Sequence, residues 1–285
     1  MEITKIGKIG GGQDGAIFGH LLFRLHQKGG CTVYDLAPLK EGGDPAYLTA
    51  FTLGSSDRIV PHCNAVCFGT EYYAEGDEFP LLYSNVYNNY ASAENQRIGE
   101  CCVYRLMREG ASFRADLVQL ITIGFCEDAA LWKASPDSHG VRPYANFLID
   151  TDTRSYYAYV MRNEEKGTRH FRFDLPSVHA GQIDPVLGVR RVVLEKEDIR
   201  DYFDLPFYRF IQGGIIEGGI LYSTEGFSNS EKNPPAIRAV DLATKREVYY
   251  HLPSFDILEE PEMIDFMDGV CYYSDAYGNL YTVSF

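Results

Sequence analysis

Apolar and polar residues alternate along this chain in short segments of about four to eight residues, a length and period typical of β-strands. The stretch from Pro61 to Leu106 contains one complete example, with AVCFG, LLYSN and CVYRL separated by polar or turn-rich residues. The same order of three segments can be traced before and after this stretch. We therefore count five three-strand units along the chain.

The units are defined by where their strands begin and end. The first strands end at Gly19, Gly69, Asp150, Gly219 and Gly269. The second strands begin at Leu21, Leu81, Tyr156, Ile220 and Cys271. The third strands end at Leu36, Leu106, Leu175, Leu242 and Phe285. Gly, Asp or Pro residues stand between the first and second strands, as hairpin turns require.

A fourth strand follows four of the units, and we expect these strands to start at Ala46, Asp116, Arg190 and Arg246. The fifth unit stops at Phe285, but residues 2–9 (EITKIGKI) have the alternation of an exposed outer strand. Lending a terminal strand to the last sheet closes a ring and removes an open sheet edge. The sequence thus predicts an all-β, five-bladed β-propeller with four-stranded blades, a single domain over residues 1–285 whose N-terminal strand 2–9 completes the last blade.

Two segments depart from the strand pattern. Residues 126–142 are polar and turn-rich, and residues 194–204 (LEKEDIRDYFD) favour a short helix on the outer rim. We interpret both as excursions within blades, because neither has enough alternation to add a sixth blade. A two-sheet sandwich is the main alternative fold, since a repeat of strands does not by itself prove a ring.

Composition and charge narrow the classes of partner. The 21 Tyr, 17 Phe and 27 Gly suit strands and turns. A net charge of −14 argues against nucleic acid or an anionic membrane as the main partner, because both attract clustered Lys and Arg. No stretch approaches the ~18 apolar residues of a membrane span, and the N-terminus lacks a signal-like segment. We therefore expect a soluble, cytoplasmic protein whose seven Cys, without CxxC spacing, are reduced core thiols.

The candidate site lies at the channel mouth, because the first strand of each propeller blade lines the central channel. Polar residues near the starts of these strands are Gln13, Asp14, His62, Asn64, Tyr144, Asn146, Gln212, Glu260 and Glu262. Residues near the ends of the second strands are Arg24, Asn85, Arg162, Glu225 and Asp275. Polar residues at strand starts also cap exposed backbone groups, so a structural role stays open for each of them.

Four of these residues suit acid and base chemistry, namely Asp14, His62, Glu225 and Glu262. We assign the others to ligand binding, since amides offer both a donor and an acceptor to hydroxyl groups. The chain has no HExxH zinc pair, no GxSxG elbow and no phosphate-binding loop. No metal site or cofactor is implied by a motif, although the channel carboxylates leave room for a cation.

The chain resembles known five-bladed propellers in architecture: furanosidase-type glycoside hydrolases, calcium-dependent nucleotidases, sugar-binding lectins and bacterial propeller proteins without an assigned function. The glycosidase resemblance implies a hydrolase or lyase acting on a carbohydrate-like substrate, with channel carboxylates on successive blades. Asp14 matches the first of these carboxylates. Asn64 and Asn146 do not ionise and depart from the pattern, so Glu225 or Glu262 would have to complete a pair within about 5 to 10 Å.

Two functions follow from these observations. The favoured one is binding or processing of a small polar, sugar-like ligand at the channel mouth. The alternative is a non-catalytic scaffold for a protein partner, with the aromatic and amide residues Tyr87, Asn88, Asn89 and Tyr90 as a candidate contact.

Overall fold

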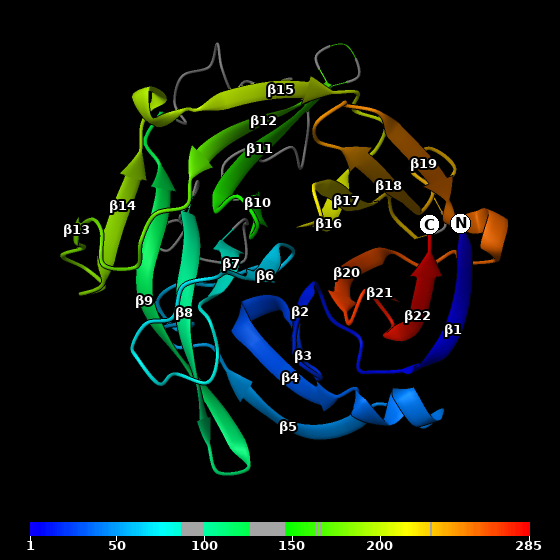
Figure 1. The fold of residues 1–285 in the computed structure, drawn as a ribbon, viewed down its shortest axis with the longest axis horizontal. Helices are drawn as coiled ribbons and strands as arrows, with labels where there is room; N and C mark the ends of the chain where they lie inside the picture. The colour runs from blue at the N-terminus through cyan, green and yellow to red at the C-terminus, as the bar shows by residue number, and fades with distance from the viewer. Residues whose placement is uncertain (87–99, 126–145, 164, 166, 229) are drawn as a thin grey trace.

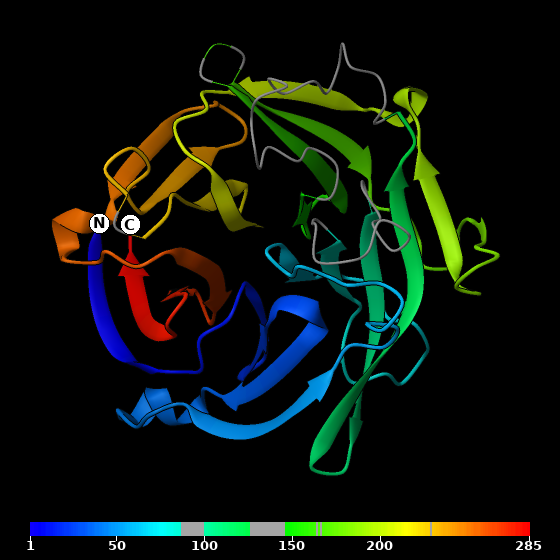
Figure 2. The ribbon, with the colours of Figure 1, turned by 180° about the vertical axis from the view of Figure 1, so that it is seen from behind.

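Five mainly antiparallel sheets stand around a common axis as a five-bladed β-propeller (Figures 1 and 2). The computed structural model describes residues 1–86, 100–125, 146–163, 165, 167–228 and 230–285, and the side chains of Arg162 and Asn163 lie outside this description. The inner strands follow the ring in sequence order, while β1 (Glu2–Lys8) joins the last blade and β13 (Gln182–Ile183) and β14 (Arg190–Leu194) return to the second. The predicted all-β, five-bladed fold is confirmed.

Each blade has a core of four strands, which follow one another from the axis outward. Blade 1 contains β2 (Gly15–Phe18), β3 (Leu21–Leu25), β4 (Gly30–Asp35) and β5 (Ala46–Thr52). Blade 2 contains β6 (Val66–Phe68), β7 (Leu82–Val86), β8 (Glu100–Glu109) and β9 (Ser112–Ile123). Blade 3 contains β10 (Phe147–Asp150), β11 (Ser155–Asn163), β12 (Gly167–Asp174) and β15 (Asp201–Leu205). Blade 4 contains β16 (Ile211–Glu217), β17 (Ile220–Glu225), β18 (Ala236–Asp241) and β19 (Glu247–His251). Blade 5 contains β20 (Pro261–Met267), β21 (Val270–Asp275), β22 (Asn279–Ser284) and β1 (Glu2–Lys8).

The ring closes through the first strand of the chain. Strand β1 pairs antiparallel with β22, so that Glu2 lies opposite Ser284 and Lys8 lies opposite Asn279. Figure 1 shows the two termini beside each other at this blade. The predicted closing strand therefore takes its place as the outer strand of blade 5.

The prediction for residues 190–204 was wrong. Strand β14 (Arg190–Leu194) is not the fourth strand of blade 3; it pairs in parallel with β9 and extends blade 2, where β13 (Gln182–Ile183) pairs with it in turn. Residues 194–204 are not a helix beyond a short 3₁₀ turn at Lys196–Asp198, and β15 supplies the fourth strand. The order of strands along the chain does not reveal this, because the excursion crosses from one blade to its neighbour and back.

Short irregular elements connect the strands. The other 3₁₀ turns cover Gln27–Gly29, Ala37–Glu41 and Leu252–Phe255. Residues 69–81 join β6 to β7, so the connection between the first and second strands of blade 2 is a longer loop and not the hairpin turn predicted between such strands. Within this loop Asp77 accepts hydrogen bonds from the guanidinium of Arg105 on β8, which attaches the loop to its own blade.

The blades pack face to face, and a separate apolar core lies at each of the five blade interfaces. The second strands are covered on both faces, which is why LLFRL in β3 is buried at every position. Outer strands such as β5 and β1 have one exposed face and keep the alternating pattern. Rings from both blades meet at the first interface, where Phe23 contacts Phe79 and Phe113 edge to face.

The six cysteines within the described residues are buried free thiols, in agreement with the expectation of core positions. Burial raises the pKa of the Cys63 thiol to about 12. Within the same residues, no helix is long and apolar enough to cross a membrane.

The inner strands β2, β6, β10, β16 and β20 leave little room at the axis. A methyl carbon added to Gly213 on β16 would lie 3.0 Å from the carbonyl oxygen of Glu262, 3.2 Å from that of Asn64 and 3.3 Å from Oδ2 of Asp14. These atoms belong to blades 5, 2 and 1. Four of the five blades therefore come close together at this level, and a larger residue at position 213 would require its neighbours to shift by a few tenths of an ångström.

We expect Gly213→Ala to lower the free energy of unfolding by roughly 1–3 kcal/mol, because the added carbon has to push apart inner strands of three other blades. Gly30→Ala is the matched control, since its added carbon would meet His26 at ordinary contact distances from 3.5 Å and its φ of −63° suits alanine. Urea unfolding of the three proteins measures the difference. Equal stability of the Gly213→Ala variant and the parent would contradict this description of the axis.

Candidate functional site

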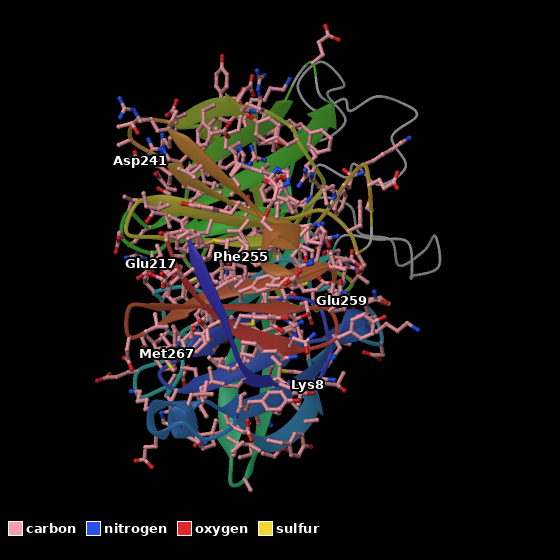
Figure 3. All side chains as sticks on the ribbon, turned by 90° about the vertical axis from the view of Figure 1, so that its right-hand side faces the viewer. Lys8, Glu217, Asp241, Phe255, Glu259 and Met267 are labelled. Carbon is pink, nitrogen blue, oxygen red and sulfur yellow. The ribbon has the colours of Figure 1, made fainter. Side chains whose placement is uncertain are left out.

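The candidate residues that the structure describes gather at one end of the inner strands. We call this end the entry face and define it by residues 12–14, 62–64, 146, 211–212 and 259–262. Figure 3 shows Lys8 and Glu259 at this face, while Glu217, Asp241 and Met267 lie at the opposite one. The ends of the second strands reach the same face, because each second strand runs antiparallel to its inner strand. The starts of the first strands and the ends of the second strands therefore lie at the same face, as expected from the order of strands in the sequence.

Asp14 joins blade 1 to blade 2. Its Oδ1 accepts a hydrogen bond from the backbone N–H of Gly15 (2.8 Å), and its Oδ2 accepts one from the backbone N–H of Val66 on β6 (2.8 Å). Burial raises the pKa of Asp14 well above its usual value, although the two N–H groups and Arg24 act in the opposite direction. Both oxygens of this predicted catalytic carboxylate are thus already bound to backbone.

Asp265 plays the same part between blades 5 and 1. This residue on β20 accepts hydrogen bonds from the N–H of Ile17 on β2 (2.6 Å) and from the N–H of Phe266 (2.7 Å). Burial raises the pKa of Asp265 to about 7. Sequence reasoning missed this residue, although a lone carboxylate inside the apolar run MIDFM was a detectable signal.

Arg24 is fully buried at the junction of blades 1 and 5. Its Nη2 donates to the carbonyl oxygens of Gly12 (3.2 Å) and Asp275 (3.0 Å). Its Nε and Nη1 have no hydrogen-bond partner among the described residues. Burial lowers the pKa of Arg24, and of the carboxylates near it Glu262 opposes this most strongly.

Glu262 is the carboxylate that complements Arg24. It is 3% exposed, its Oε1 accepts a hydrogen bond from Nε2 of Gln13 (3.3 Å), and its Oε2 has no partner within the described part of the chain. Burial raises the pKa of Glu262 well above its usual value, and Arg24 is the main group that lowers it. The two residues nevertheless form no direct ion pair, so complementary charged groups lie near each other with hydrogen-bonding capacity unused.

Two further predicted residues extend this cluster toward blade 4. Nε2 of Gln212 donates to Oε1 of Glu260 and to the carbonyl oxygen of Gly226 (2.9 Å). The backbone N–H of Glu260 is held by the hydroxyl of Ser228 (2.6 Å). Burial raises the pKa of Glu260, while the bond from Gln212 lowers it. Blades 1, 4 and 5 therefore share one polar cluster, formed by Gln13, Arg24, Gln212, Glu260 and Glu262.

The amides of blades 2 and 3 form a separate buried group. Nδ2 of Asn85 donates to Oδ1 of Asn64 (2.5 Å) and Oδ1 of Asn146 (3.4 Å), and Oδ1 of Asn85 accepts from the N–H of Ala65 (3.1 Å). Cys63, next to Asn64, has a left-handed φ of 67°, which turns its carbonyl toward the N–H of Asp14 (3.0 Å). The hydrogen bonds described here join these amides to one another and to backbone. They therefore connect blade 2 with blade 3.

His62 is half-buried, and its backbone N–H donates to the carbonyl oxygen of Asn85 (3.2 Å). Asp275 is fully buried, and its carboxylate accepts from the N–H groups of Tyr277 and Asn279 and from Nδ2 of Asn279 (2.7 Å). It thereby shapes the turn between β21 and β22, while its carbonyl holds Arg24. The predicted residue Tyr144 and the scaffold candidates Tyr87, Asn88, Asn89 and Tyr90 lie outside the described residues, as does the side chain of Arg162.

Glu225 belongs to a different environment from Glu262. Its Oε1 accepts hydrogen bonds from Nε of Arg238 (2.7 Å) and from the hydroxyl of Ser223 (2.9 Å), and Nη2 of Arg238 is 2.5 Å away. Both charged side chains are at most 1% exposed. Arg238 also donates to the carbonyl oxygen of Pro206 in the segment that leaves blade 3 (2.7 Å). The Glu225 carboxylate is thus held at the interface of blades 3 and 4, and sequence reasoning missed its partner.

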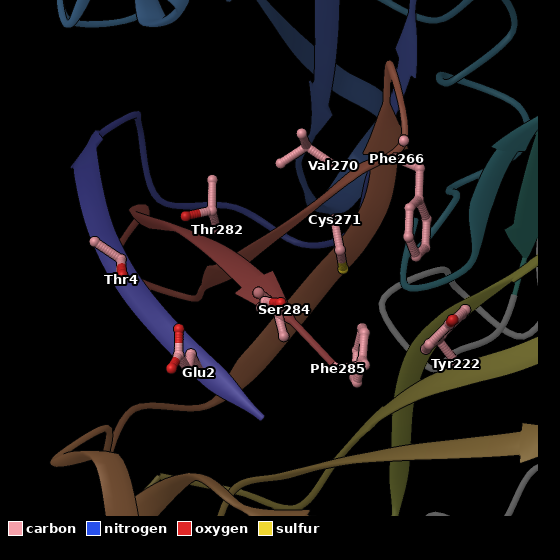
Figure 4. A pocket seen from close by; sticks show the side chains of 11 residues that line it. Glu2, Thr4, Tyr222, Phe266, Val270, Cys271, Thr282, Ser284 and Phe285 are labelled. Carbon is pink, nitrogen blue, oxygen red and sulfur yellow. The ribbon is translucent and has the colours of Figure 1, made fainter.

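The entry face offers no ready metal centre within the described residues, where no group of three or more His, Cys, Asp or Glu side chains is arranged to hold a metal ion. Figure 4 shows a pocket on the opposite face, between blades 4 and 5, with a volume of about 490 Å³. Phe285 and Phe266 both contact the ring of Tyr222 there, at centroid distances of 4.7 Å and 5.1 Å. This pocket is separate from the candidate site.

No family model matches the chain, and no curated protein matches it. Among solved structures it is similar to an alpha-L-arabinofuranosidase from Clostridium thermocellum, with a TM-score of 0.49 and 11% identity over 92% of this chain and 80% of that one. It is also similar to the computationally designed Ika8 protein (TM-score 0.38, 9% identity, 99% of both chains) and to BamB from Moraxella catarrhalis (TM-score 0.33, 8% identity, 95% of this chain and 69% of that one). At these values the comparisons assign no activity to this chain.

We expect Asp265→Asn to reduce the dependence of stability on pH. An unfolded Asp loses its proton near pH 3.8, whereas the folded protein keeps the Asp265 proton to about pH 7. Between these values the folded state binds more protons, so its stability falls as pH rises. From pH 5 to pH 8 the parent should lose on the order of 3 kcal/mol more than the variant. Urea unfolding at both pH values measures this, and parallel losses would refute the assignment.

We expect Glu225→Ala to cost roughly 3–5 kcal/mol of stability, because it leaves the buried Arg238 guanidinium without its carboxylate. The exposed pair between Arg200 and Asp174 is the control, and Asp174→Ala should cost at most about 1 kcal/mol. Thermal and urea unfolding compare the two variants. A Glu225→Ala protein as stable as the parent would show that this carboxylate is free for another role.

Proposed function

We propose that the entry face binds a small, uncharged, hydroxyl-rich ligand such as a sugar or polyol, with Arg24, Glu262 and Gln13 as its main polar contacts. The observation that carries the proposal is the pair of unused hydrogen-bonding groups on Arg24 and Glu262. Leaving a buried polar group unpaired costs about 1–3 kcal/mol, and more when it is charged. A ligand that supplies hydrogen-bond partners for these groups is therefore favoured.

A hydroxyl group meets this requirement better than other small groups. It accepts a hydrogen bond from the guanidinium and donates one to the carboxylate, which neither a pure donor nor a pure acceptor can do. Gln13 and Gln212 add amides, which recognise hydroxyls through the same double capacity. The opposite charges of Arg24 and Glu262 also balance each other, which favours a neutral ligand over an ion.

The second part of the proposal is that the protein also converts the bound ligand in a chemical reaction. Burial raises the pKa of Glu262, so its carboxylate takes up a proton more readily than an ordinary glutamate does, and this suits a group that passes a proton to the substrate in a hydrolase or lyase reaction. Asp14 is less suited to be its partner, because both of its oxygens hold backbone N–H groups of two blades. We therefore propose Glu262 as the acid and do not propose Glu225, whose carboxylate is bound to Arg238.

We expect a panel of monosaccharides, oligosaccharides and polyols to contain ligands that raise the melting temperature of the protein and bind in calorimetry. Glu262→Gln should weaken the best ligand roughly 10- to 100-fold, because it removes a charged hydrogen-bond acceptor worth about 1.5–3 kcal/mol. Gln13→Ala should weaken it less, and the exposed Gln182→Ala is its matched control.

Mass spectrometry of the incubated ligand distinguishes binding from processing, since products should appear with the parent and be lost with Glu262→Gln. The proposal fails when no panel member binds the parent protein, because the unused groups are then served by water. It also fails when Gln13→Ala and Glu262→Gln both bind as the parent does. A ligand that binds without product formation removes only the proposed acid role.

A further inference from the structure

A second polar pocket lies on the outer rim, between blades 3 and 4. Residues 206–210 cross there from β15, the outer strand of blade 3, to β16 of blade 4, and they pass beside the outer strand β19. Figure 1 shows β15 and β19 as neighbouring outer strands. The pocket has a volume of about 530 Å³, and Tyr208, Arg209, Lys232, Tyr249 and His251 are among the residues that line it. None of these residues belongs to the cluster of Arg24 and Glu262.

The pocket is locally positive in a chain with a net charge of −14. Neither Arg209 nor Lys232 forms an ion pair with any carboxylate of the described residues. The nearest carboxylate on β19, that of Glu247, already accepts bonds from the hydroxyl of Tyr208 (2.6 Å) and from Nη1 of Arg238 (3.4 Å). Two positive charges on the lining are therefore left without a balancing carboxylate, and an anion would provide the balance.

Arg209 is held in a fixed position. Its Nη1 donates to the carbonyl oxygen of Pro234 (2.9 Å), and its Nη2 lies 3.4 Å from Nδ1 of His251. Its guanidinium lies over the ring of Tyr249, 5.1 Å from the centroid. A guanidinium fixed in this way loses little conformational freedom when it binds, and its planar fork suits the two oxygens of a carboxylate or phosphate.

Aromatic side chains form the walls of the pocket, and like Arg209 they are held in position by neighbouring groups. Tyr208 is 47% exposed, and its ring meets the ring of Tyr249 edge to face at a centroid distance of 5.2 Å. The hydroxyl of Tyr208 is bound to Glu247, and the buried guanidinium of Arg238 lies 5.2 Å from the centre of its ring. Glu247 and Arg238 therefore hold the Tyr208 ring in position while its apolar surface faces solvent. Such a ring suits contact with another planar group.

We propose that this rim pocket binds a small anion that carries a planar ring, in which a carboxylate or phosphate group contacts Arg209 and Lys232 and the ring contacts Tyr208. This site is independent of the ligand proposed for the entry face. The rim pocket uses its positive charge and the exposed Tyr208 ring together. It should therefore bind ligands that have only an anionic group, or only a planar ring, more weakly.

Calorimetry with simple probes tests the proposal on the full chain. Benzoate and phenyl phosphate carry both features, benzyl alcohol carries only the ring, and acetate and inorganic phosphate carry only the charge. We expect at least one of the first two to bind at least tenfold more tightly than each of the other three, and to bind more weakly as salt screens the charges. The tighter of the two identifies carboxylate or phosphate as the preferred group.

Three variants locate the probe. Arg209→Gln, Lys232→Gln and Tyr208→Leu should each weaken the bound probe severalfold, and Lys40→Gln is the matched control because it removes the same charge from the exposed surface of blade 1. Near-ultraviolet circular dichroism checks that each variant is folded, and Lys232→Gln alters only an exposed side chain. Glu262→Gln should leave this binding unchanged, which separates it from the entry face.

Three results would overturn the proposal. Binding of benzyl alcohol as tight as that of benzoate and phenyl phosphate would remove the role of the charge. Equal effects of Lys40→Gln and Lys232→Gln would show a general response to net charge. Binding of neither aromatic anion to the parent protein would show that the pocket does not take this class of ligand.

Discussion

The inner strands of a propeller have a ladder partner on one side only, and their other edge faces the axis. Backbone N–H groups on that edge are buried and still require acceptors. In this protein carboxylates provide them across blade boundaries, with Asp14 bound to Val66 N–H and Asp265 bound to Ile17 N–H. The axis is narrow at Gly213, where three other blades come within contact distance, so little room is left there for other acceptors.

This constraint separates two kinds of buried polar residue at the entry face. Asp14, Asp265, Asp275 and the amides of Asn64, Asn85 and Asn146 satisfy backbone groups or one another. Arg24 and Glu262 do so only in part, and each retains buried polar atoms without a partner among the described residues. A search for functional residues by burial and charge alone would treat both kinds as equal. The hydrogen bonds distinguish the two kinds, and our proposal of ligand binding rests on the second kind.

The sequence predicted most of the fold because each blade repeats the same order of strands and turns. It failed at residues 190–204, where DYFDL has the polar neighbours of a rim helix and RRVVL has the pattern of any outer strand. Which blade an outer strand joins depends on tertiary contacts that local alternation does not encode. The sequence indicated that strand starts converge at one face, and the described candidates lie there. It did not reveal their hydrogen-bond partners, because Arg238, which binds Glu225, lies on the next strand. Asp265, a carboxylate that joins blades 5 and 1, lies within an apolar run.

The path of residues 175–200, which run from blade 3 to blade 2 and back, affects how the propeller unfolds. In repeat proteins each unit contacts mainly its neighbours, and units can unfold one after another. Here the chain leaves blade 3 after β12, adds β14 to the edge of blade 2 through a parallel ladder from Arg190 to Leu194, and only then returns to complete blade 3 with β15. Blade 3 is therefore tied to blade 2 by the main chain on both sides of this ladder as well as by side-chain packing. We expect these two blades to unfold together more readily than other neighbours.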